Sequence, residues 1–141
     1  MLQAMIQKLV RQAGTRDPFE IARQKHIIIT EEPLGSIRGY YSRSHRQPVI
    51  HINSALSESQ RRFTCAHELG HALLHPKANT PFLHSRTLFS VNRYEIEANR
   101  FAVWLLISDE DLAEYPDRTI PQLAQIFGVT PALMEHRLKG R

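Results

Sequence analysis

Cysteine and long apolar runs are scarce in this sequence of 141 residues. The single cysteine, Cys65, excludes a disulfide within the chain, so a reducing, cytoplasmic setting is expected. No apolar run approaches the roughly 20 residues that a membrane-spanning helix needs. The first residues also lack the basic segment and long apolar block of a signal peptide, so neither a membrane span nor secretion is expected.

Charge of one sign is only in modest excess, because the net charge is +4. Basic proteins can favour nucleic acid, but Lys and Arg are scattered along this chain, which favours an ordinary solvated surface. The length predicts a single domain over 1–141. Histidine is the informative excess: there are eight, and several fall at the spacing of metal ligands.

The first half of the chain is typical of helix followed by sheet. N-terminal helices are expected over 1–25, with a helix start at Asp17, where a capping residue is followed by proline and glutamate. Dense β-branched runs separated by turn residues then predict a small, mostly antiparallel, three-stranded sheet over 26–53. The expected strands are 26–30, 37–42 and 48–53.

The second half is helical in pattern. A capping box at Ser57 predicts the start of a long helix, and a second strong helix is expected over about 93–107. Residues 76–92 are expected to form a loop between them, so that the zinc-binding helices fall within 57–107. A C-terminal helical cap is expected over 108–141, with short helices near 119–127 and 131–138.

The strongest chemical signal is His67-Glu68-Leu69-Gly70-His71, an H-E-x-x-H motif in a helical context. Residues four apart share one helix face, so both imidazoles can bind a single tetrahedral Zn²⁺. Glu68 projects beside the metal, where it can take a proton from the attacking water. Gly70 costs roughly 1 kcal/mol of helix stability relative to alanine, which suggests that another segment approaches closely there. The motif predicts a zinc-dependent peptidase.

A catalytic zinc needs a third protein ligand and an open position. His75 lies one further turn along the same helix and cannot fold back onto the same ion, so a packing role is favoured for it. The second helix offers two carboxylates. Glu95 lies closer to its buried face than Glu97, and Asn99 could hold a ligating histidine by a hydrogen bond. We therefore predict Glu95 as the third ligand, with Glu97 as the alternative.

Two segments of the chain resemble a known family. Residues 62–75 (RFTCAHELGHALLH) look like the core of the ImmA/IrrE family of metallopeptidases. Residues 95–102 (EIEANRFA), followed by Leu105 and Leu106, are similar to the second motif of that family. The resemblance covers about residues 17–135.

The resemblance implies a compact α+β, zincin-like domain with a Glu-zincin metal site of the thermolysin type. In such a site His67 and His71 would bind zinc, Glu68 would be the general base, and the acidic ligand would come from 95–99. Family members encoded by phages and mobile elements cleave a helix-turn-helix repressor, so a repressor protein is the expected substrate. The family's second motif often continues Leu-Leu-Met-Pro, whereas this chain has isoleucine and Ser108 there, a departure that concerns only the helix end.

Peptide hydrolysis also requires a donor to the tetrahedral oxyanion. Tyr94, His84 and His75 are the candidates, and the sequence does not choose among them. Cys65 precedes the H-E-x-x-H motif by two residues. We expect it to be a small, buried helix residue rather than a nucleophile or a metal-switching thiol.

A different class of function is suggested by residues 119–133, which have the pattern helix, glycine turn, helix. The second helix lacks the Arg, Asn or Gln cluster that reads bases, so DNA binding is not favoured and a helical cap is preferred. The alternative function is a non-cleaving regulatory or DNA-binding protein that controls transcription by binding a repressor or DNA.

Overall fold

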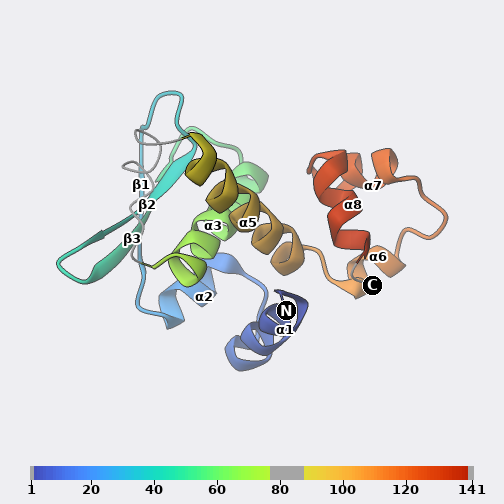
Figure 1. Ribbon diagram of the computed structural model, residues 1–141, viewed down its shortest axis with the longest axis horizontal. Coiled ribbons are helices and arrows are strands. Elements are labelled where there is room, and N and C mark those ends of the chain that lie inside the picture. Colours follow the sequence, from blue (N-terminus) through green and yellow to red (C-terminus); the bar gives the residue numbers. More distant parts are fainter. Residues whose placement is uncertain (1, 77–87, 140–141) are drawn as a thin grey trace.

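The computed structural model describes residues 2–76 and 88–139, with side chains described over 2–76 and 93–139. Two helices precede a three-stranded sheet, and further helices follow it (Figure 1). Among the described residues, no helix combines the length and apolar character needed to cross a bilayer. The elements in chain order are α1 (Leu2–Ala13), α2 (Pro18–Gln24), β1 (Ile28–Glu32), β2 (Gly39–Ser44), β3 (Gln47–Asn53), α3 (Glu58–Leu74), α5 (Leu88–Leu106), α6 (Asp109–Ala113), α7 (Ile120–Phe127) and α8 (Pro131–Lys139).

The helix starts that the sequence predicts are confirmed by cap geometry. The Asp17 carboxylate accepts a hydrogen bond from the backbone N–H of Phe19 and caps α2. The Ser57 side chain accepts from the N–H of Gln60, whose side chain in turn accepts from the N–H of Ser57, and this capping box starts α3. The same reciprocal arrangement begins α6 at Ser108 and α7 at Thr119.

The predicted loop over 76–92 is wrong at its C-terminal side, because α5 already begins at Leu88. Asn92 favours turns, yet asparagine costs less than about 1 kcal/mol in a helix interior, so the apolar residues around it can extend the helix. The other residues of that predicted loop, 77–87, lie outside the described part of the chain.

The sheet has the strand order β1-β3-β2. The prediction of a small three-stranded sheet is confirmed, but the pairing is mixed rather than mostly antiparallel: β2 pairs with β3 in antiparallel fashion, while β1 runs parallel to β3. A tight turn at His45 and Arg46, with φ of 51° and 66°, joins β2 to β3. β3 lies between β1 and β2 and runs in the same direction as β1. Alternation of apolar residues is the same for both pairings, so the sequence pattern could not show this.

Helices α3 and α5 form the centre of the molecule, with the sheet on one side and α6, α7 and α8 at the far end (Figure 1). Their close approach rests on Gly70, where an added Cβ would lie 3.0 Å from Cδ1 of Phe101. The close approach predicted at Gly70 is therefore confirmed, and it brings facing side chains of α3 and α5 within hydrogen-bonding distance of one another.

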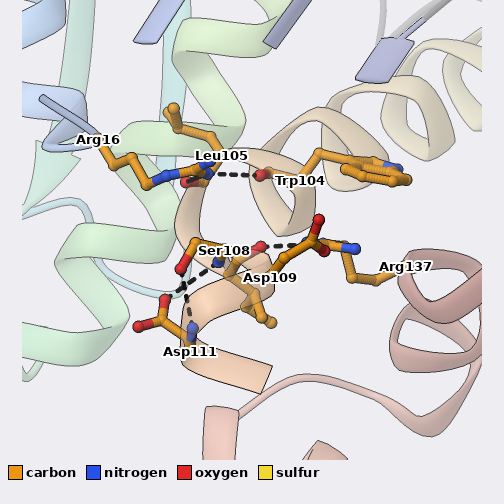
Figure 2. A network of polar contacts seen from close by, with 8 residues as sticks. Arg16, Trp104, Leu105, Ser108, Asp109, Asp111 and Arg137 are labelled. Atoms are coloured by element: carbon orange, nitrogen blue, oxygen red, sulfur yellow. Dashed lines mark hydrogen bonds and ion pairs between the residues drawn. The ribbon is translucent and has the colours of Figure 1, made fainter. Parts of the chain in front are cut away.

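Two arginines bind the C-terminal end of α5 (Figure 2). Arg16 donates to the backbone oxygens of Trp104 and Leu105 at 3.2 and 2.9 Å. From α8, Arg137 donates to the backbone oxygen of Ile107 at 2.9 Å and to Oδ1 of Asp109 at 2.8 Å. Carbonyl groups at a helix end lack intrahelical donors, and these contacts satisfy them. Arg16 attaches the segment between α1 and α2 to α5, and Arg137 attaches α8.

Candidate metal centre

The two histidines of the H-E-x-x-H motif lie one turn apart on α3 and face α5. Their rings meet edge to face, with centroids 4.8 Å apart. Helix α3 is held in place by apolar residues that are fully buried in the core, among them Ala66 and Leu69. His71 is itself fully buried, and His67 keeps a narrow exposed edge.

Glu95 of α5 completes a cluster of three metal-ligating side chains. Its Oε2 lies 2.8 Å from Nε2 of His67, and its Oε1 lies 2.9 Å from Nε2 of His71. One ligating atom from each of the three residues falls within 4.8 Å of the others. The structure thus brings together all three side chains that the sequence singles out as ligands.

The second glutamate of α5 points elsewhere. Oε2 of Glu97 lies 3.0 Å from Nε2 of His75, and its Oε1 lies 3.4 Å from Nε of Arg93. Residues two apart on a helix do not share a face, so Glu95 and Glu97 contact different partners. The geometry favours Glu95 over Glu97 and places His75 at the C-cap of α3, in the packing position expected for it.

Glu68 is buried on α3 beside His67. Its side chain is 6% exposed, and its Oε2 lies 3.8 Å from Nε2 of His67. Oε1 has no hydrogen-bond partner within the described part of the chain. Burial raises the pKa of Glu68 to about 7, because the attraction of His67 only partly offsets the cost of desolvating the carboxylate.

The electrostatics of the cluster fit a divalent cation. Burial would raise the pKa of Glu95, but the hydrogen bonds to His67 and His71 outweigh it and hold that pKa well below its usual range. Glu95 is therefore an anion at neutral pH. Two imidazole nitrogens and one carboxylate, meeting from two helices, are a donor set that could hold a metal ion.

Asn99 lies one turn beyond Glu95, as predicted for a residue that supports a histidine. Burial would lower the pKa of His67, but Glu95, Glu68 and a side-chain contact with Asn99 together raise it. Nδ1 of His67 nevertheless has no hydrogen-bond partner among the described residues, so a hydrogen bond from Asn99 to this ring stays a prediction.

A cleft of about 670 Å³ opens onto this cluster. It is lined by His67, Glu68 and Glu95, and on the opposite side by β2, where Gly39 stands. A Cβ on Gly39 would lie 2.6 Å from the backbone oxygen of His51, so only glycine fits there. Sequence reasoning did not assign Gly39 to the site, although a glycine inside a strand is the usual sign of such a close approach.

Two of the three candidates for an oxyanion donor, Tyr94 and His75, do not line the cleft. Tyr94 packs against His75, with ring centroids 4.2 Å apart, and neither is among the described residues that line the cleft. His84 lies outside the described residues. Cys65 is fully buried, and burial raises the pKa of its thiol far above the usual range, which fits the predicted packing role.

Known proteins resemble this chain over most of its length. The family model of the IrrE N-terminal-like domain (Peptidase_M78) matches residues 22–139. The chain is 43% identical over 139 residues to the "Uncharacterized immunity region protein 2" of Bacillus phage phi105, covering 96% of this chain and 87% of that protein. It is 30% identical over 139 residues to the metallopeptidase ImmA of Bacillus subtilis (strain 168), covering 94% of this chain and 81% of that one.

A solved structure shows the same fold. A Mycobacterium tuberculosis transcriptional regulator superposes with a TM-score of 0.58 at 18% identity, over 97% of this chain. This chain spans 46% of the length of that regulator, so the likeness concerns the fold alone. Since the family model covers most of the sequence and ImmA is similar over nearly all of it, the chain belongs to the ImmA/IrrE family of metallopeptidases.

Proposed function

We propose that this protein is a zinc-dependent endopeptidase of the Glu-zincin type, in which His67, His71 and Glu95 bind the metal and Glu68 is the general base. The observation that carries the proposal is the convergence of two imidazole Nε2 atoms on one carboxylate, with a second, buried carboxylate beside them. A metal in such a site supplies a Lewis acid that polarises the scissile carbonyl and acidifies water.

Each side chain has a separate role in the proposed reaction. His67 and His71 hold their rings at a fixed angle because α3 is packed tightly on α5. Glu95 contributes the anionic ligand from the facing helix. The carboxylate of Glu68 is buried, lines the cleft and lies beside His67, so it can accept the proton of the attacking water and deliver it to the leaving amine.

The proposed substrate is a helix-turn-helix repressor of a phage or mobile element, acting in the cytoplasm. Support comes from the relatives: one is named an immunity region protein of a Bacillus phage, and another is named a metallopeptidase. The cleft beside the metal-ligating cluster, at about 670 Å³, has room for a stretch of polypeptide.

The alternative, a DNA-binding regulator, is disfavoured by the C-terminal helices. Helices α7 and α8 do form a helix-glycine-helix unit, with Gly128 in the left-handed conformation at φ 70°. The side chain of Arg137 in α8, however, is 2% exposed and is bound to Asp109 and to the backbone of Ile107. A guanidinium held in this way is not available to a base edge.

Co-expression with a candidate repressor tests the proposal. Wild type is expected to cut the repressor, and Glu68→Gln is expected to keep bound zinc, measured by elemental analysis, while losing cleavage by at least roughly 100-fold. Glu97→Gln is the matched control on α5 and should cut normally. Cleavage by Glu68→Gln would exclude Glu68 as the base, and stoichiometric binding without cleavage by wild type would favour the non-cleaving regulator.

A further inference from the structure

A second cavity adjoins the cleft at the metal-ligating cluster. It has a volume of about 550 Å³ and lies between α3, α5 and the turn that joins α7 to α8. Three residues line both spaces: Arg38, Phe63 and Asn99. Because the same side chains line both, the two cavities are neighbours, one at the cluster and the other at the C-terminal helices.

The floor of the second cavity is apolar and comes from all the surrounding helices. Phe63 of α3 and Leu106 of α5 face it, and Phe127 and Leu133 approach from α7 and α8. These four side chains are half-buried, so each keeps apolar surface in contact with solvent. Apolar surface in a concave site favours the burial of a large apolar side chain from a ligand.

The rim of the second cavity is basic. Arg38, just before β2, and Arg62 of α3 are both exposed, and no carboxylate lies within 4.0 Å of either within the described residues. The neighbouring Arg61 differs, because its Nη1 lies 3.3 Å from Oε2 of Glu31. No acidic residue is found among the described residues that line this cavity, so its charge complements a carboxylate.

We propose that this second cavity is the specificity site of the peptidase, and that it takes the part of the substrate on one side of the scissile bond. A large aliphatic or aromatic side chain packs on Phe63, Leu106 and Leu133, and a neighbouring Asp or Glu lies near Arg38 and Arg62. The inference rests on the proposed function, since it takes the substrate to be a peptide cut at the metal-ligating cluster.

The C-terminal helices thereby gain a role in recognition. Phe127 and Leu133 reach the cavity only because α7 and α8 are held on α5, where Arg137 of α8 donates to the backbone of Ile107.

The test uses fluorescein-labelled peptide pools in which a fixed Phe or Ser is adjacent to a fixed Glu or Lys. Binding is measured by fluorescence polarisation on the full chain carrying Glu68→Gln, and cleavage of the same pools is measured on the zinc-loaded chain with Glu68 intact. In both assays the protein also carries one further substitution, and these substitutions form two matched pairs of a test and a control. Ser59→Trp fills the cavity, whereas Glu58→Trp adds the same side chain one residue away, outside the lining. Arg62→Glu reverses a rim charge, whereas Arg11→Glu reverses one on α1.

We expect the Phe/Glu pool to bind best. Ser59→Trp should weaken that binding at least roughly tenfold, the range for losing one apolar pocket contact. Arg62→Glu should shift the Glu-over-Lys preference by roughly two- to fivefold, as for an exposed ion pair. Glu58→Trp should leave the binding of this pool unchanged, and Arg11→Glu should leave the Glu-over-Lys preference unchanged. In the cleavage assay the same preference should appear in KM rather than in kcat.

The outcomes separate the two proposals. Selective binding that Ser59→Trp abolishes, without cleavage, would overturn the peptidase function and keep the peptide site. Cleavage with a preference that neither Ser59→Trp nor Arg62→Glu alters would keep the peptidase and overturn the specificity site. Binding of a labelled DNA duplex that depends on Arg62, with no peptide preference, would also overturn it.

Discussion

Gly70 of α3 lies directly against the ring of Phe101 of α5. A Cβ on Gly70 would be 3.0 Å from Cδ1 and 3.1 Å from Cβ of Phe101, closer than such atoms normally approach. Phe101 is fully buried, so it has little room to move away. The glycine inside the H-E-x-x-H motif therefore sets the spacing between the helix that carries two histidines and the helix that carries Glu95.

Gly70→Val should destabilise the fold. Overpacking of a buried contact costs about 1–3 kcal/mol, which exceeds the gain in helix propensity over glycine. Urea unfolding followed by circular dichroism would measure it as a lower midpoint with little change in slope. Gly70→Ala adds a single carbon, so its urea midpoint should lie between those of Gly70→Val and wild type. A valine variant as stable as wild type would show that α3 and α5 can separate without cost.

Metal affinity should distinguish the two glutamates of α5. Glu95→Gln removes the anion that contacts both histidines, so zinc affinity should fall by more than the roughly 10- to 100-fold typical of losing a supporting residue. Glu97→Gln removes a carboxylate that contacts His75 and Arg93, and affinity should change little. Competition with a chromophoric zinc chelator measures both. Equal losses in the two variants would contradict the assignment of Glu95.

Much of the site could be predicted from the sequence because its chemistry is local. His67 and His71 share a helix face by their spacing. Glu95 lies nearer than Glu97 to the buried face of its own helix, so helical periodicity favours Glu95 but leaves Glu97 as the alternative. The capping residues Asp17 and Ser57 are local signals too, and they marked the helix starts correctly.

Features that depend on distant segments were not predictable in the same way. The parallel pairing of β1 with β3 follows from strand order, which alternation does not encode. The place of Gly39 opposite α3 depends on how the sheet packs against that helix. Arg137 has the sequence context of an exposed residue on a short helix, yet it is buried, because Asp109 and the end of α5 supply its partners.

Arg137→Ala should lower stability substantially. Its guanidinium lies 4.1 Å from the centroid of the Trp104 ring and bonds the backbone oxygen of Ile107 and the carboxylate of Asp109. Truncation leaves a buried carbonyl without its donor and opens a void, for a combined cost of about 2–4 kcal/mol. Lys139→Ala is the control on α8, because its side chain is 72% exposed and its pair with Glu135 spans 3.9 Å. Thermal unfolding of both variants is the measurement, and equal melting temperatures would contradict a structural role for Arg137.

Stability should also depend on pH through His136 of α8. Trp104 donates its indole N–H to Nε2 of His136 at 3.3 Å, and burial, with the charges of Arg100 and Lys139, lowers the pKa of His136. A histidine whose pKa is lower in the folded state favours the neutral form there. Its stabilising contribution is present above the unfolded pKa of about 6.5 and is lost as pH falls toward the folded value.

Urea midpoints of wild type and His136→Gln, measured from pH 8 down to pH 5, should therefore converge as the pH falls. His26→Gln is the control, since His26 is exposed at the end of α2, and a constant difference between wild type and His136→Gln across the range would contradict the prediction.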